Sequence, residues 1–116
     1  MATIKSFSDL EQSKKLAEIL PLESADMFLA MNGILPVMSK YIDDGYVTAD
    51  DTAIPCWSLA ALLSALDFPS LTQNKEDEWE VCVPNHQSDG YTEVLASNPI
   101  DACYKMILKL KESNLL

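Results

Sequence analysis

The stretch that decides the fold is WEVCVPNHQSDGYTEVLASNPIDACYKMILKL, residues 79–110. Apolar and polar residues alternate over 79–83, which is the period of a strand with one buried face. Pro84 ends that strand, and a turn-rich connection at 85–90 leads to a second β-prone segment at 91–96. The two segments predict a pair of neighbouring antiparallel strands.

A helix is expected directly after this strand pair. Asn98 is a good N-cap, Pro99 suits the first helical position, and the negative charge of Asp101 complements the helix dipole. The inward stripe of this helix is Ile100, Cys103, Ile107 and Leu110, flanked by Met106. Two strands followed by an amphipathic helix predict a helix packed on a small sheet.

Upstream, SLAALLSAL (58–66) has the clearest helical spacing in the chain, with leucines at 59, 62, 63 and 66. Its three alanines make most of the circumference apolar, so we expect this helix to be buried on more than one side. Pro55 is compatible with a helix start nearby, and Trp57 is expected in the core. The polar residues at 70–78 predict a loop.

At the N-terminal side, Ser8 and Glu11 form a capping-box pattern, and Pro21 stops the helix that follows. We therefore expect a helix over residues 8–20. Its apolar face consists of Leu10, Ala17 and Leu20, widened by Leu16 and Ile19.

The continuous apolar run at 25–31 predicts a buried central strand. Asn32-Gly33 is a strong hairpin signal between that run and the next one, at 34–38. Pro36 cannot donate to a strand ladder, so the second run is expected to be an edge strand or no strand. Residues 41–54 predict an acidic loop, with Tyr46 and Val47 as a brief strand.

These elements predict an α+β protein of one domain, residues 1–116. The expected order is α-β-(β)-α-β-β-α, with helices packed on a small, mostly antiparallel sheet. A chain of this length buries roughly two-thirds of its unfolded surface, so it needs no metal or disulfide to hold its core.

The chain carries 18 acidic residues against 8 lysines and has a net charge of −10. Such a field repels nucleic acids and anionic membranes, so we expect neither as a direct partner. It favours solubility, or a basic partner. Apolar runs such as 27–31 are too short to span a bilayer, and no signal peptide is recognisable.

Three cysteines at wide spacing, Cys56, Cys82 and Cys103, form neither a disulfide framework nor a zinc pattern. Each lies in an apolar stretch, where a free cysteine behaves as a small hydrophobic residue. Free thiols suit a reducing compartment, and we expect a cytoplasmic protein.

Catalytic signals are scarce, because the chain has no arginine, one histidine (His86) and three glycines. Cys82, His86 and Asp89 are the residue types of a nucleophile, a base and an orienting group. Such groups usually converge from separate parts of a fold, whereas these are close neighbours at a hairpin tip. We therefore expect no enzyme and assign no catalytic residue.

Two acidic segments are candidates for other sites. Oxygen ligands for calcium are available in the predicted loop, but their spacing does not match an EF-hand, and His86 with the cysteines offers no zinc quartet. A solvated loop is favoured, and we assign no metal site and no cofactor. The second segment borders a predicted strand and could protect an edge or mimic phosphates. The loop acids are Asp43, Asp44, Asp50 and Asp51, and the second group is Glu76, Asp77 and Glu78 with Glu80.

Aromatic side chains are a further candidate for a binding surface, since tryptophan and tyrosine are enriched in binding hot spots. Both tryptophans are expected in the core because of their apolar-periodic surroundings. The candidates are Trp57, Trp79, Tyr41, Tyr46, Tyr91 and Tyr104.

Three segments together carry a resemblance: FSDLEQSKKL (7–16), IPCWSLAALL (54–63) and NPIDAC (98–103). They resemble small uncharacterised proteins carried by phages, prophages and mobile elements of gut bacteria. The resemblance implies an intracellular, phage-linked setting. No activity, cofactor or site residue follows from it.

From these observations we predict a non-enzymatic intracellular protein-interaction module from a phage-related element. The partner is expected to be a protein, and a homodimer is one of the states considered. One alternative is an acidic decoy that inhibits a nucleic-acid-binding protein or enzyme. Another is a small hydrolase or ligand-binding protein, which would need a pocket with convergent polar groups.

Overall fold

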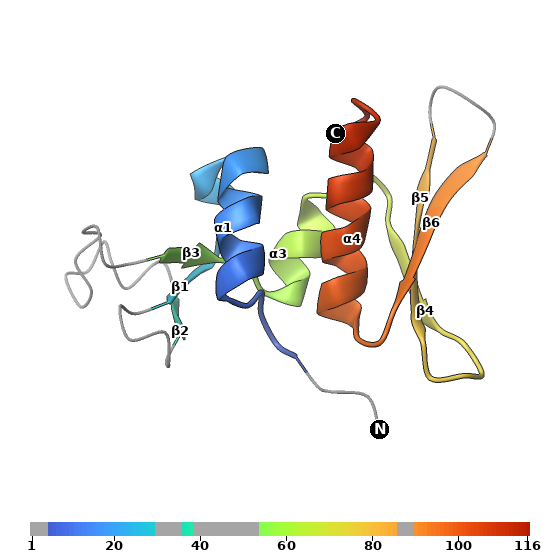
Figure 1. Cartoon of the computed structure of the whole chain (residues 1–116), viewed down its shortest axis with the longest axis horizontal. Coiled ribbons are helices and arrows are strands. Elements are labelled where there is room, and N and C mark those ends of the chain that lie inside the picture. The colour runs from blue at the N-terminus through green and yellow to red at the C-terminus, as the bar shows by residue number, and fades with distance from the viewer. Residues whose placement is uncertain (1–4, 30–35, 39–53, 86–89) are drawn as a thin grey trace.

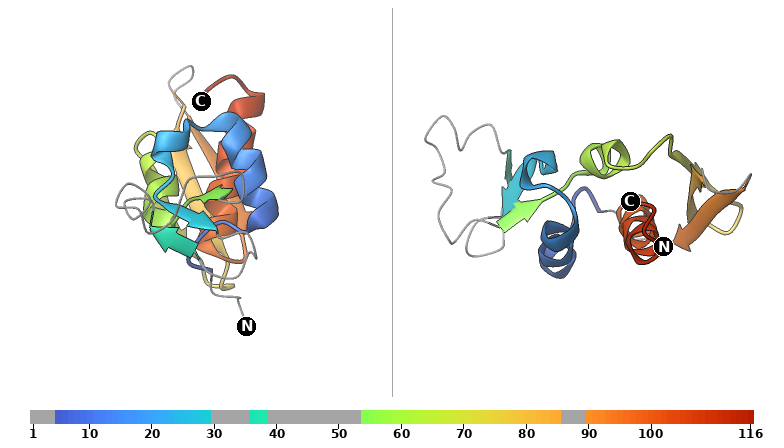
Figure 2. Two further views of the ribbon diagram at one scale, coloured as in Figure 1. Left: turned by 90° about the vertical axis from the view of Figure 1, so that its left-hand side faces the viewer. Right: turned by 90° about the horizontal axis from the view of Figure 1, so that it is seen from above.

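The computed structural model describes residues 5–29, 36–38, 54–85 and 90–116. The described residues form three α-helices and two small antiparallel sheets, which confirms the predicted α+β class and the predicted order of elements (Figure 1). The elements are α1 (Leu10–Ile19), the 3-10 turn η1 (Leu22–Ser24), β1 (Met27–Leu29), β2 (Pro36–Met38), β3 (Ile54–Cys56), α3 (Leu59–Ser64), β4 (Ser70–Gln73), β5 (Trp79–Pro84), β6 (Tyr91–Ala96) and α4 (Pro99–Glu112). The helices lie between the two sheets, as Figure 1 and the right-hand view of Figure 2 show.

The larger sheet has the order β4-β5-β6, and the predicted strand pair forms its β5–β6 hairpin. Val81 lies opposite Val94, and Cys82 lies opposite Glu93. Val81 and Val83 are buried against α4, while the other face of the sheet is free of described elements (Figure 1). The sheet therefore has one face in the core and one open face.

Strand β4 corrects the prediction of a loop over 70–78, because Ser70–Gln73 pairs with β5. Only Leu71 of this strand is half-buried, so β4 lacks the apolar alternation that identifies a strand in a sequence. The rest of the predicted loop forms the β4–β5 turn. There the Asn74 side-chain oxygen accepts hydrogen bonds from the amides of Glu76 (2.9 Å) and Glu78 (3.0 Å).

The smaller sheet has the order β2-β1-β3, so β1 is central and the proline-containing β2 is an edge strand, as predicted. The side chains of β1 are half-buried rather than buried. Strand β3 was not predicted. Pro55, which the sequence places near a helix start, lies in this strand at the other edge of the sheet. The Asn32-Gly33 turn and the strand expected at Tyr46 and Val47 lie outside the described residues.

Helix α1 begins two residues later than predicted, at Leu10. Asp9 is its N-cap and forms a capping box with Gln12, so the expected pairing of Ser8 with Glu11 is wrong. The Ser8 hydroxyl instead accepts from the amide of Trp57 (3.0 Å) and hydrogen-bonds the Ser13 hydroxyl (2.8 Å). This tertiary contact removes Ser8 from the cap. Leu10 is accordingly exposed, and Leu16 carries the buried face.

The core lies between α1, α3, α4 and the larger sheet. Trp57 is fully buried, as predicted, and its indole N–H donates to the Ser24 hydroxyl (3.0 Å). The predicted stripe of α4 is buried along its whole length, whereas Trp79 is half-buried at the border of the core. Helix α3 ends at Ser64, two residues earlier than predicted, and is capped by Ser58. None of the described helices combines the length and the hydropathy needed to cross a bilayer.

Candidate functional site

The residues proposed as a nucleophile, base and orienting group are only partly within the described chain. His86, Asp89 and the four loop acids, with Tyr41 and Tyr46, lie outside the described residues, so the sites built on them stay predictions. Cys82 is described and lies half-buried on the open face of the larger sheet, where its thiol donates to Glu80 Oε1 (3.2 Å).

The surroundings of Cys82 are the opposite of those that activate a thiol. Desolvation raises the pKa of Cys82. The hydrogen-bonded Glu80 carboxylate and the charge of Glu93 raise it further, while a hydrogen bond with Ser70 lowers it. Burial raises the pKa values of Cys56 and Cys103 to about 12. Reactive cysteines have lowered pKa values, so none of the three thiols is prepared for nucleophilic attack.

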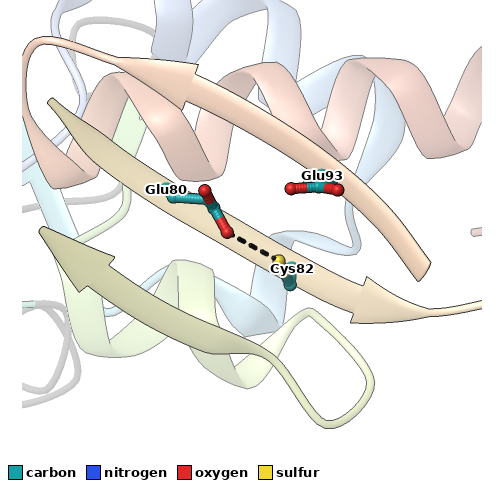
Figure 3. A group of neighbouring side chains, drawn as sticks. All are labelled: Glu80, Cys82 and Glu93. Atoms are coloured by element: carbon teal, nitrogen blue, oxygen red, sulfur yellow. Dashed lines mark hydrogen bonds between the residues drawn. The ribbon is translucent and has the colours of Figure 1, made fainter. Parts of the chain in front are cut away.

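The register of the larger sheet brings together a side-chain cluster that sequence analysis missed. Cys82 and Glu80 are two residues apart on β5 and therefore point to the same face, and Glu93 lies opposite Cys82 on β6 (Figure 3). One ligand-type atom from each of the three side chains lies within 4.8 Å of the others. We call these three residues the Glu80–Cys82–Glu93 cluster.

The sequence groups Glu80 with the acids at 76–78, but in the structure those acids belong to the β4–β5 turn. Alternation along both strands carried a signal for the observed cluster, because it puts Glu80, Cys82 and Glu93 on polar faces. Their contact, however, depends on which residue of β6 faces which residue of β5. That register is a property of the paired strands and not of either strand alone.

A second feature is a pair of neighbouring cavities at the C-terminal end of α4. The first, about 350 Å³, lies between α4 and β5, and the second, about 430 Å³, lies between α4, α3 and the end of α1. Ala65 and Leu116 line both cavities, which are mostly apolar. The other apolar residues that line them are Val83, Pro84, Leu110 and Leu115 in the first cavity and Ile19, Leu20 and Pro21 in the second.

Large apolar side chains are exposed around these cavities. Leu116 is 46% exposed, Leu22 next to Pro21 is 59% exposed, and Phe68 next to Asp67 of the first cavity is 78% exposed. We call Leu22, Phe68, Leu116 and the two cavities the apolar end. Leu116 lines both cavities, and Leu22 and Phe68 directly follow lining residues in the sequence, so this end of the fold is a candidate contact surface.

Phe68 also has an unusual backbone conformation, with φ of 49°. The left-handed region costs a non-glycine residue roughly 1–2 kcal/mol, and Pro69 contributes by disfavouring the right-handed helical region for Phe68. The chain thus holds a large aromatic side chain in water on a strained backbone. Strain of this kind is concentrated at functional sites.

The remaining aromatic candidates are distributed over both surface and core. Tyr91 is 72% exposed at the start of β6, and Tyr104 is half-buried on α4 against the core. With Trp57 in the core and Trp79 at its border, the described candidates form no continuous aromatic patch. Phe68, which sequence analysis treated only as part of a helix end, is the most exposed large apolar side chain among the described residues.

No protein-family model, no curated protein and no solved structure matches the chain.

Proposed function

We propose that this protein is a non-enzymatic protein-interaction module that binds its partner through the apolar end. The observation that supports the proposal is the combination of exposed Phe68 and Leu22 with two apolar cavities that share Leu116. Full burial of a leucine or phenylalanine side chain contributes about 1.5–3 kcal/mol. A partner that covers this end therefore gains from each side chain that the isolated chain leaves in water.

A second copy of the chain is the first partner to consider. In a two-fold symmetric dimer the same patch occurs on both sides, so the patch has to complement itself. The apolar end offers both parts of such a contact, because it combines the exposed side chains of Phe68 and Leu22 with cavities of about 350 and 430 Å³.

The net charge of −10 opposes self-association. Salt screens repulsion between like charges over roughly 8–10 Å at physiological ionic strength, while the apolar contact is not weakened by salt. Dimerisation through the apolar end should therefore strengthen as salt is added.

The experiment compares Phe68→Ser with Tyr91→Ser by analytical ultracentrifugation over a range of protein and salt concentrations. The two aromatic residues are similarly exposed, 78% and 72%, but only Phe68 belongs to the apolar end. We expect the wild type and Tyr91→Ser to dimerise and Phe68→Ser to remain monomeric. Dimers that Phe68→Ser leaves unchanged would contradict the proposal.

If the wild type is monomeric throughout, the homodimer is wrong and the partner has to be another protein. The same two variants then serve in pull-downs from host lysate. A stoichiometric partner bound by the wild type and by Tyr91→Ser, and lost by Phe68→Ser, supports the apolar end as the binding surface. A partner retained by Phe68→Ser counts against it.

An acidic decoy remains the second candidate, supported by Glu80 and Glu93 on the open face of the larger sheet. Binding of a basic, nucleic-acid-binding partner through such carboxylates should weaken steeply as salt is added. This salt dependence is opposite to that of the apolar end, and it distinguishes the two candidates. We also propose that the module comes from a phage-related element, as its resemblance implies, and the identity of the neighbouring genes tests this origin.

A further inference from the structure

We propose that the Glu80–Cys82–Glu93 cluster is a binding site for a divalent transition-metal ion of the zinc type. The cluster shares no residue with the lining of the two cavities at the apolar end. A metal site at the cluster goes beyond the proposed binding at the apolar end and can be tested independently of it.

The strand geometry directs the three side chains toward one point. Residues i and i+2 of a strand share a face, and a directly paired residue on the neighbouring strand lies about 4.5–5.5 Å away. Glu80 and Cys82 supply the first relation, and the Cys82–Glu93 pair supplies the second. All three ligands thus approach from the sheet (Figure 3), and the solvent side is left for water or another ligand.

The distances are close to those that a bound ion requires. Zinc binds sulfur at about 2.3 Å and carboxylate oxygen at about 2.0–2.2 Å, so tetrahedral ligands lie about 3.5 Å apart. The thiol and the Glu80 carboxylate are already 3.2 Å apart, and the largest separation in the cluster is within 4.8 Å. Small side-chain rotations of Glu80 and Glu93 are enough to close the site.

Charge balance provides an independent argument. Asp9 and Asp101 lie close together at the beginnings of α1 and α4, where Lys5 bridges them at 3.0 and 2.8 Å. Glu80 and Glu93 converge in the same way, yet no ion pair within the described residues includes either of them. Like charges at this separation repel, and a cation between them removes the repulsion.

The sulfur ligand selects the class of metal. Thiolates favour zinc and similar transition metals, whereas magnesium and calcium prefer sites built from oxygen alone. On binding, the S–H bond of Cys82 breaks, its proton passes to the buffer, and the sulfur electron pair forms the bond to the metal. Because the thiol of Cys82 has to lose its proton to bind the metal, binding should tighten as the pH rises.

Cobalt(II) is the probe, because a thiolate ligand gives cobalt a near-ultraviolet charge-transfer absorption that oxygen ligands do not give. Titration of the reduced protein should produce this absorption with one equivalent of cobalt. Added zinc should abolish it, and excess calcium should not. Calorimetry under the same conditions should show one zinc site and the release of a proton.

Two substitutions remove ligands and one serves as the matched control. Cys82→Ser should abolish the charge-transfer absorption, and Glu93→Gln should weaken zinc binding by on the order of tenfold or more, since even outer-shell partners contribute that much. Glu112→Gln removes an exposed carboxylate at the end of α4 and should bind as the wild type does.

Several results would overturn the site. The proposal is wrong if the wild type shows no charge-transfer absorption, or if Cys82→Ser retains it, which would assign the signal to Cys56 or Cys103. Zinc binding that Glu93→Gln leaves unchanged would also refute it. Circular dichroism of each variant verifies that the fold is intact, and the association assays above report separately on the apolar end.

Discussion

Lys5 joins the beginnings of α1 and α4, and replacing it with methionine should destabilise the fold. Its ammonium group donates to Asp101 (2.8 Å), to Asp9 (3.0 Å) and to Gln12 (3.2 Å). Asp101 also accepts from the side chains of Gln12 (2.7 Å) and Asn98 (2.8 Å). Methionine keeps the length and the apolar stem of lysine while it removes the charge and all three donors.

The size of the expected destabilisation follows from how exposed Lys5 and its two aspartate partners are. Exposed ion pairs contribute about 0.2–1 kcal/mol, and hydrogen bonds to charged groups contribute about 1.5–3 kcal/mol. The side chains of Lys5 and Asp101 are 24% and 29% exposed, which puts this pair between the two cases, while Asp9 is half-exposed and adds little. We expect Lys5→Met to lower the free energy of unfolding by about 2 kcal/mol and Tm by roughly 8 °C.

The pKa shifts of the three groups determine how this loss of unfolding free energy depends on pH. Desolvation alone would raise the pKa values of Asp9 and Asp101, but their hydrogen bonds and the charge of Lys5 outweigh it and lower both. Desolvation would likewise lower the pKa of Lys5, and the two aspartates outweigh it and raise that pKa above 10.5. The interaction is therefore fully present between about pH 4 and pH 10.5. It is lost as the pH falls through the lowered pKa values of the aspartates or rises through the raised pKa of Lys5.

Urea denaturation at pH 7 measures the effect, with Lys15→Met as the control. Lys15 also contacts one carboxylate, Glu18 at 3.6 Å, but both side chains are mostly exposed, and we expect a change within about 0.5 kcal/mol. Repeating the comparison at pH 3 should bring the two variants closer together. A loss for Lys5→Met no larger than that for Lys15→Met at pH 7 would refute the reasoning.

Two further predictions concern the thiols and the cap of α1. In the native state a thiol reagent should label Cys82 alone, and the labelling should become faster as the pH rises. The fully buried Cys56 and Cys103 should react only in denaturant, and mass spectrometry counts the labels. Rapid labelling of all three thiols in the native state would contradict the observed burial. Asp9→Ala should lower the free energy of unfolding by about 1 kcal/mol through loss of the N-cap, whereas Glu11→Ala should change it by less than about 0.5 kcal/mol. Denaturation curves of the two variants decide between the observed cap and the one expected from the sequence.

The amino-acid sequence by itself determined the elements that depend on local periodicity. The buried stripe of α4, its Asn98-Pro99 start and the alternation of β5 all follow from neighbours a few residues apart. Pro36 likewise identified an edge strand, because a missing amide excludes a central position wherever the strand pairs. Steric and hydrogen-bonding constraints of this kind act within one segment and need no knowledge of the rest of the chain.

Tertiary structure decided the features that depend on contacts between distant segments. Strand β4 exists because β5 offers it an edge, although its own residues are polar. Ser8 leaves the helix cap because Trp57, far along the chain, supplies a buried amide for it. The meeting of Cys82 with Glu93 requires the register of two strands. Local patterns cannot encode these outcomes, because each depends on which remote segment packs or pairs alongside, and that choice is made by the fold as a whole.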